Sequence, residues 1–187
     1  MSHSDNNYLA QSSRLGLYAY STMSVKRILI LGLGNTLVCD DGVGIYASRT
    51  ASAMLAKQPD IKNKIEIQEA EIGGFTLIDI LAGYNIAIII DAIKLPDSIP
   101  GTIVELSSDT LKRSSHLVSG HQIDLPTALT LGAELGYHMP KTVHIIAIQI
   151  TNDTIFSEQP SHYLKTAIDT AATRAIEFAK KYLKKLM

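Results

Sequence analysis

The sequence predicts an α/β protein, a three-layer α/β/α sandwich on a mostly parallel, twisted sheet of about five strands. Short β-branched runs alternate along the chain with segments whose apolar residues recur every three or four positions. That alternation is typical of strands joined by crossover helices. The run Ile86 to Asp91 lacks polar alternation, which indicates a strand buried on both faces of the sheet.

The N-terminal half of this pattern predicts two strand and helix pairs. The run from Arg27 to Asn35 is short, apolar and glycine-closed, as expected of a buried strand entering a tight loop. Apolar residues then follow helical spacing after Gly42, and this helix should end before Pro59. Residues 65–71 alternate as a strand does, and residues 75–83 return to helical spacing.

After the strand at Ile86, the C-terminal half predicts two more strands and two helices. The strands are expected at 101–107 and 141–150, where β-branched residues gather. Asp124 precedes Leu-Pro, which suits a helix cap, and that helix should run to about Gly136. A long amphipathic helix is expected from Ser161 onward, and its last lysines complement the negative end of the helix dipole.

Composition narrows the class of protein. The chain has 187 residues, of which 46% are hydrophobic and 19% charged, which excludes a mainly disordered protein. The formal net charge of −1 gives no overall attraction for phosphates, so we expect no nucleic-acid partner. The single cysteine, Cys39, cannot form an internal disulfide, which favours a reducing, cytoplasmic location. No apolar run approaches the ~20 residues that cross a bilayer, so we expect no membrane insertion.

The domain organisation is expected to be simple. Residues 25–187 should form a single domain, because their length suits one hydrophobic core. Residues 1–24 lack the features of a signal peptide and are interpreted as a noncatalytic N-terminal tail.

Polar side chains gather where the parallel strands are expected to end. Asp41 follows the first strand together with Asp40, Asp91 ends the central strand, and His121 lies in a loop ahead of a helix. In an open α/β sheet such loops meet at one edge. Two carboxylates and an imidazole could then bind a first-row metal ion such as nickel or zinc. Each residue also has an ordinary alternative: Asp41 as a helix cap, Asp91 as a loop cap, and His121 as a surface histidine.

Other chemistries are disfavoured. A dinucleotide fingerprint would need a glycine where this chain has Leu37, and the lysine of a phosphate-binding loop is absent. Ser114 and Ser115 lack the glycine pattern of a nucleophile elbow, and Cys39 is flanked by an acid. If the protein uses an aspartic dyad, Asp41 with Asp91 is the better pair.

Four segments carry a specific resemblance: ILILGLGNTLVCDDGVG, IGGF, IIIDAI and SGHQIDLPTAL. In this order they resemble the motifs of the NiFe-hydrogenase maturation endopeptidases, from about Arg27 to the C-terminus. Asp41, Asp91 and His121 fall on the metal-contacting positions of that family. His116 is a second histidine in the same loop, but the Gln-Ile-Asp that follows His121 favours the latter.

The resemblance implies an aspartic-type endopeptidase that activates a hydrogenase. It would remove the C-terminal extension of the hydrogenase large-subunit precursor after nickel insertion. Asp41, Asp91 and His121 would contact nickel that substrate cysteines already hold, so the protein would need no resident metal and no organic cofactor. Two alternatives stay open on the same scaffold: a self-sufficient metal-dependent hydrolase, and a noncatalytic chaperone for the precursor.

Overall fold

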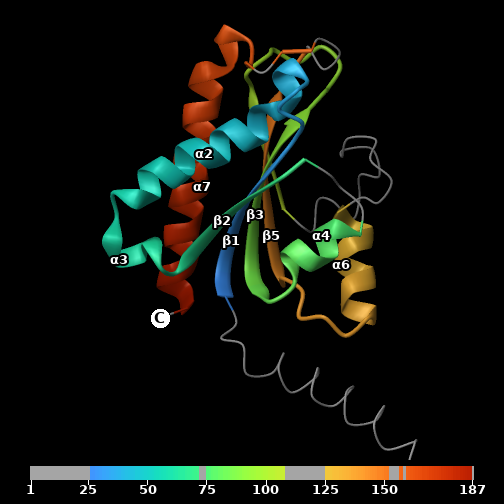
Figure 1. The fold of residues 1–187 in the computed structure, drawn as a ribbon, viewed down its shortest axis with the longest axis vertical. Helices are drawn as coiled ribbons and strands as arrows, with labels where there is room; N and C mark the ends of the chain where they lie inside the picture. Colours follow the sequence, from blue (N-terminus) through green and yellow to red (C-terminus); the bar gives the residue numbers. More distant parts are fainter. Residues whose placement is uncertain (1–25, 72–74, 108–124, 152–155, 158, 187) are drawn as a thin grey trace, which may run out of the picture.

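The computed structural model describes residues 26–71, 75–107, 125–151, 156–157 and 159–186. In these residues a five-stranded sheet is covered by helices (Figure 1). The strands are β1 (Lys26–Leu33), β2 (Ile65–Ala70), β3 (Tyr84–Ile93), β4 (Ile103–Ser107) and β5 (Thr142–Gln149). The helices are η1 (Cys39–Gly42), α2 (Val43–Ala56), α3 (Pro59–Lys62), α4 (Thr76–Leu81), α6 (Leu125–Glu134), η2 (His162–Leu164) and α7 (Lys165–Leu186), of which η1 and η2 are short 3-10 turns.

The sheet has the strand order β2-β1-β3-β5-β4. Neighbours among β2, β1, β3 and β5 pair in parallel, whereas the edge strand β4 runs antiparallel to β5. The mostly parallel sheet of about five strands is therefore confirmed. From β1 the chain moves outward to β2 and then returns past β1 to β3. The carboxyl ends of β1 and β3 form the switch point, where ligand sites of open α/β sheets lie.

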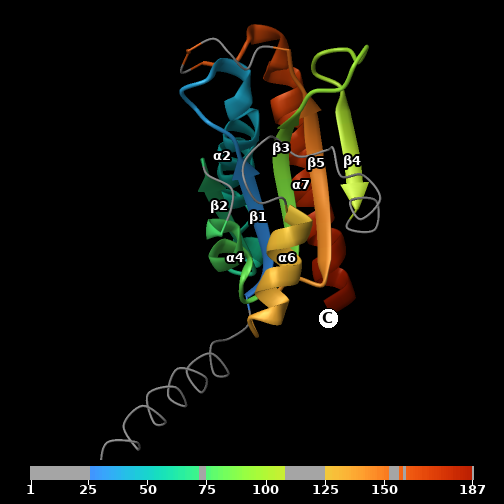
Figure 2. The same cartoon turned by 90° about the vertical axis from the view of Figure 1, so that its right-hand side faces the viewer.

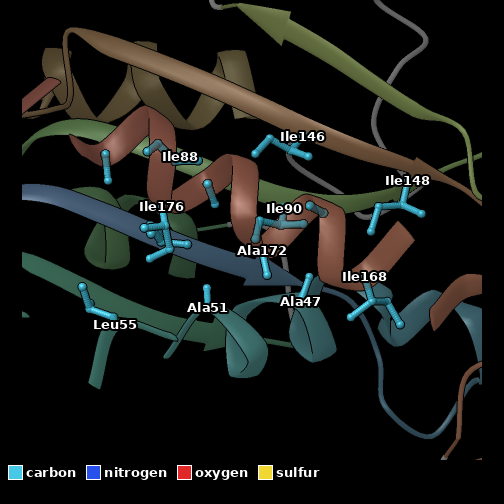
Figure 3. Close-up of a cluster of buried hydrophobic side chains, with 14 of the residues drawn as sticks. Ala47, Ala51, Leu55, Ile88, Ile90, Ile146, Ile148, Ile168, Ala172 and Ile176 are labelled. Atoms are coloured by element: carbon cyan, nitrogen blue, oxygen red, sulfur yellow. The ribbon is translucent and has the colours of Figure 1, made fainter. Parts of the chain in front are cut away.

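Helices cover both faces of the sheet, so the three-layer prediction is also confirmed (Figure 2). On one face, α2 and α7 pack their alanines and isoleucines against β1, β3 and β5 (Figure 3). On the other face, α4 and α6 cover the alternate residues of the same strands. Ile88 and Ile90 face the first layer, and Ala87 and Ile89 the second. The central strand is buried on both faces, as its sequence predicts.

The strand and helix positions agree with the sequence prediction, and the differences lie at the ends. The central strand β3 is longer than the predicted Ile86 to Asp91 at both ends, since it begins at Tyr84 and ends at Ile93. The short helix α3 was not predicted. It begins at Pro59, whose fixed backbone and missing N–H suit the first turn of a helix. Among the described residues, no helix is both long and apolar enough to cross a membrane.

Some predictions concern residues outside the described ranges. Among them are the tail at residues 1–24 and the cap Asp124. The division of the chain into a tail and one domain stays a prediction.

The first turn of α2 packs against the switch point more closely than a side chain would allow. A Cβ atom on Gly44 would lie 2.2 Å from the carbonyl oxygens of both Leu33 and Ile90. A Cβ on Gly32 of β1 would lie 2.4 Å from the carbonyl oxygen of Gly44 and 2.5 Å from Ser48 Oγ. Glycine at these positions therefore lets α2 start directly against β1 and β3.

We predict that Gly44→Ala lowers the free energy of unfolding by about 3 kcal/mol, because the added methyl group must displace backbone on two strands. Urea unfolding measures the change. Ser52→Ala is the matched control, because Ser52 is exposed on the same helix and the variant should be near neutral. Equal stability of the two variants would contradict the close packing at Gly44.

Candidate functional site

Asp41 lies in η1, directly between β1 and α2. The backbone N–H of Asn35 donates to Asp41 Oδ2 at 2.9 Å. The N-cap residue of α2 is Gly42, which has no side chain to cap the helix. Asp41 Oδ2 binds the loop that leaves β1.

The loop after β1 is a tight turn built on Gly34 and Asn35. Asn35 Oδ1 accepts the N–H of Leu37 at 2.9 Å, a local bond that favours turns. Gly34 has a φ of +144°, and a Cβ there would lie 2.2 Å from the carbonyl oxygen of Asp41. The glycine thus allows the chain to fold back until the Asn35 N–H meets the Asp41 carboxylate.

Asp91 lies near the end of β3, at the same edge of the sheet as η1. The N–H of Ala92 donates to Asp91 Oδ1 at 2.8 Å. Burial raises the pKa of Asp91 to about 7; the bond from Ala92 opposes the rise, and the negative charge of Asp41 adds to it. Asp41 and Asp91 therefore interact electrostatically, as a pair of carboxylates that meet at the switch point should.

The structure brings two of the three predicted site residues together. His121 and its competitor His116 lie outside the described residues. Within residues 26–71, 75–107, 125–151, 156–157 and 159–186, no group of three or more His, Cys, Asp or Glu side chains is placed to hold a metal ion. The described part of the site is thus the pair of carboxylates Asp41 and Asp91.

The neighbouring carboxylate, Asp40, binds the segment that precedes α7. Its side chain is fully buried, and Oδ1 accepts the N–H of Ser161 at 2.8 Å while Oδ2 accepts the hydroxyl of Tyr163 at 2.6 Å. Burial alone would raise the pKa of Asp40, but the bonds from Tyr163, Ser161 and Cys39 outweigh it and hold that pKa below its ordinary value. Asp40 is a buried structural carboxylate rather than a partner of Asp41 in a dyad.

Cys39 is buried beside Asp40, which agrees with its exclusion as a nucleophile. Its Sγ lies 3.4 Å from Asp40 Oδ1 and 3.8 Å from Ser161 Oγ. The other proposed nucleophiles, Ser114 and Ser115, lie outside the described residues.

Sequence reasoning missed the residues that hold the two carboxylates in place. Asn35 had a local signal, because asparagine after glycine is typical of a side-chain-stabilised turn. Tyr163 and Ser161 had none, because they lie 123 and 121 positions from Asp40 and only the fold brings them together.

We predict that NMR titration of the Asp91 carboxyl carbon in the free protein gives a pKa near 7. Asp41→Asn should lower that pKa, because it removes the neighbouring negative charge and keeps the shape of the side chain. Asp169→Asn, an exposed change on α7, is the control and should leave it unchanged. An ordinary Asp91 pKa in the wild-type protein would contradict the burial of Asp91 near the charge of Asp41.

The raised pKa also predicts how stability depends on pH. The folded-state pKa of Asp91, about 7, exceeds the ordinary value of 3.8, so the folded protein binds the extra proton and loses stability as pH rises between these values. Asp91→Asn removes this cost. With allowance for the partial exposure of Asp91, the variant should be more stable than wild type by on the order of 2 kcal/mol at pH 8 and nearly equal at pH 4. Urea unfolding at both pH values measures the difference in free energy of unfolding between the variant and wild type. A difference that does not change with pH would refute the prediction.

Comparison with known proteins places this chain in a family. Residues 50–178 match the HycI family of hydrogenase maturation proteases. The chain is 29% identical over 160 residues to the hydrogenase expression/formation protein HupD of Thiocapsa roseopersicina, which covers 83% of this chain and 67% of HupD. It is 28% identical over 123 residues to the hydrogenase 2 maturation protease of Escherichia coli strain K12, covering 65% of this chain and 72% of that protein.

A solved structure shares the fold of this chain. The structure of the hydrogenase maturating endopeptidase HybD from E. coli superposes with a TM-score of 0.67 at 24% identity, covering 83% of this chain and 93% of HybD. At that identity the likeness concerns the fold alone, and it agrees with the sheet and layers described above. The family match extends from α2 into α7, and Asp91 lies within it. The chain is therefore a peptidase that belongs to the hydrogenase maturation protease family.

Proposed function

We propose that this protein removes the C-terminal extension of a NiFe-hydrogenase large-subunit precursor once nickel has been inserted, and that Asp41, Asp91 and His121 recognise that nickel. Membership of the hydrogenase maturation protease family supports the reaction class. The observation that supports the site is the charge interaction of Asp41 and Asp91 at the switch point of the sheet.

Two neighbouring carboxylates suit a cation that arrives with the substrate. Burial and the charge of Asp41 make the ionised form of Asp91 costly in the free protein. A divalent ion between the two carboxylates would remove that repulsion and favour the ionised form. Nickel held by precursor cysteines could accept these oxygens, with the imidazole of His121 as a third ligand. In this proposal nickel belongs to the substrate, and the protein keeps no resident metal or organic cofactor.

Binding of the substrate nickel would place the adjacent peptide bond. Fixing that bond beside the carboxylates lowers the entropic cost of hydrolysis, and a nearby cation polarises its carbonyl. Water adds to the carbonyl carbon, the C–N bond breaks, and the proton passes to the leaving amine. In this hypothesis Asp41 or Asp91 is the general base that takes a proton from the attacking water. The single cysteine of the chain is consistent with cytoplasmic processing.

The proposal predicts that the protein shortens a nickel-loaded precursor and leaves the nickel-free precursor intact. Mass spectrometry of the precursor from the same cell, incubated with the protein, measures the loss of a C-terminal peptide. Asp41→Asn and Asp91→Asn should each slow processing by roughly 100-fold or more, because each removes a negative ligand and keeps the side-chain shape. Asp169→Asn, an exposed change near the start of α7, is the control and should process normally.

Comparing His121→Ala with His116→Ala identifies which of the two histidines contacts the nickel. Only the variant that lacks the true ligand should lose processing, and loss in His116→Ala alone would remove His121 from the site. Cleavage of both forms of the precursor would refute nickel recognition. Precursor binding without cleavage would favour the chaperone, and nickel retained tightly without precursor would favour a self-sufficient hydrolase.

A further inference from the structure

Asp40 is a fully buried carboxylate that the proposed reaction does not use. Both of its oxygens accept hydrogen bonds from residues near the start of α7. The N–H of Ser161 donates to Oδ1 at 2.8 Å, and the hydroxyl of Tyr163 donates to Oδ2 at 2.6 Å. Cys39 Sγ lies a further 3.4 Å from Oδ1. A buried carboxylate with this set of donors is an anchor, because removing the donors would leave an uncompensated charge.

The anchor joins two loops that leave different strands. Residues 34–38, after β1, and residues 156–157 and 159–164, before α7, lie side by side at the upper edge of the sheet in Figures 1 and 2. They are also joined through their backbones, since Ser157 N–H donates to the Leu37 carbonyl at 3.1 Å and Val38 forms an antiparallel bridge with Phe156. Asp40 adds side-chain hydrogen bonds from Ser161 and Tyr163 to these backbone contacts.

The turn that carries Asp41 needs such support. Element η1 has four residues, and a 3-10 turn of that length has poor hydrogen-bond geometry of its own. Cys39 has a φ of +21°, a conformation that residues other than glycine seldom adopt and that persists only when surrounding contacts hold it. Asp40 follows Cys39 directly and precedes Asp41, so its anchor acts on both.

We propose that Asp40, held by Ser161 and Tyr163, is a positioning residue that fixes the Asp41 carboxylate at the processing site. It acts through the backbone of η1, which directs Asp41 Oδ2 to the N–H of Asn35. The effect of Asp40 on catalysis rests on the proposed function, whereas its effect on the geometry of Asp41 does not. In this role Asp40 touches neither the substrate nor the reacting bond. Loss of Asp40 should therefore disturb the chemical step more than precursor binding.

Variants of Tyr163 and Asp40 weaken the anchor to different degrees. Tyr163→Phe removes one hydroxyl and keeps the ring, whereas Asp40→Ala removes both acceptors. Asp40→Asn is the conservative variant, because its amide oxygen can still accept the Ser161 N–H. Tyr182→Phe is the matched control: it removes a tyrosine hydroxyl from the other end of α7.

The first readout is native-state hydrogen exchange of the Asn35 N–H, which reports its bond to Asp41 without any precursor. Tyr163→Phe should speed this exchange about tenfold and Asp40→Ala more, with Asp40→Asn between wild type and Asp40→Ala. The N–H of Ile88 in the central strand should keep its protection in each variant. Unchanged exchange at Asn35 in Asp40→Ala and Tyr163→Phe would overturn the proposal, and so would an equal loss of protection at Ile88.

The second readout is processing of the nickel-loaded precursor under conditions in which every variant is folded. Asp40→Ala should lower kcat by roughly 10- to 100-fold and leave KM within about twofold, Asp40→Asn should recover part of kcat, and Tyr182→Phe should match wild type. A rise in KM alone would assign Asp40 to precursor binding and overturn the proposal. If wild type cleaves no precursor, the proposed function fails, and the exchange of Asn35 still decides whether Asp40 positions Asp41.

Discussion

The site depends on the backbone contact between the first turn of α2 and the carboxyl ends of β1 and β3. No side chain fits between Gly44 and the carbonyl oxygens of Leu33 and Ile90. Because the helix starts there, η1, which directly precedes it and carries Asp41, is held beside the end of β3. The meeting of Asp41 with Asp91 is thus a consequence of how closely a helix packs on a sheet.

This packing has an electrostatic cost that the fold only partly offsets. The N–H groups of Asn35 and Ala92 each donate to one carboxylate, yet the pKa of Asp91 stays raised to about 7. A fold selected for stability alone would hold an amide or an apolar residue there. Local destabilisation at a solvent-accessible switch point is typical of functional sites, because a ligand can relieve it.

The sequence was sufficient to predict the layers, the central strand and the closeness of Asp41 and Asp91. Those features depend on patterns within short segments and on the rule that parallel strands end at one edge. The antiparallel direction of β4 was not predicted, because its short alternating run is compatible with either direction. The role of Asp40 was not predicted either, since its donors come from Ser161 and Tyr163, far along the chain. The choice between histidines concerns residues outside the described ranges.

Asp40 and Asp41 show why residue type and position alone do not assign a role. They are neighbours in one short turn, and consecutive side chains there must point in different directions. Asp40 points into the protein, where three donors keep its charge compensated and its pKa low. Asp41 accepts the N–H of Asn35, and its charge adds to the rise in the pKa of Asp91 that burial causes. We therefore propose different roles for the two carboxylates: Asp40 holds the turn in place and Asp41 contacts the substrate nickel. The difference follows from their surroundings and not from the sequence Asp-Asp.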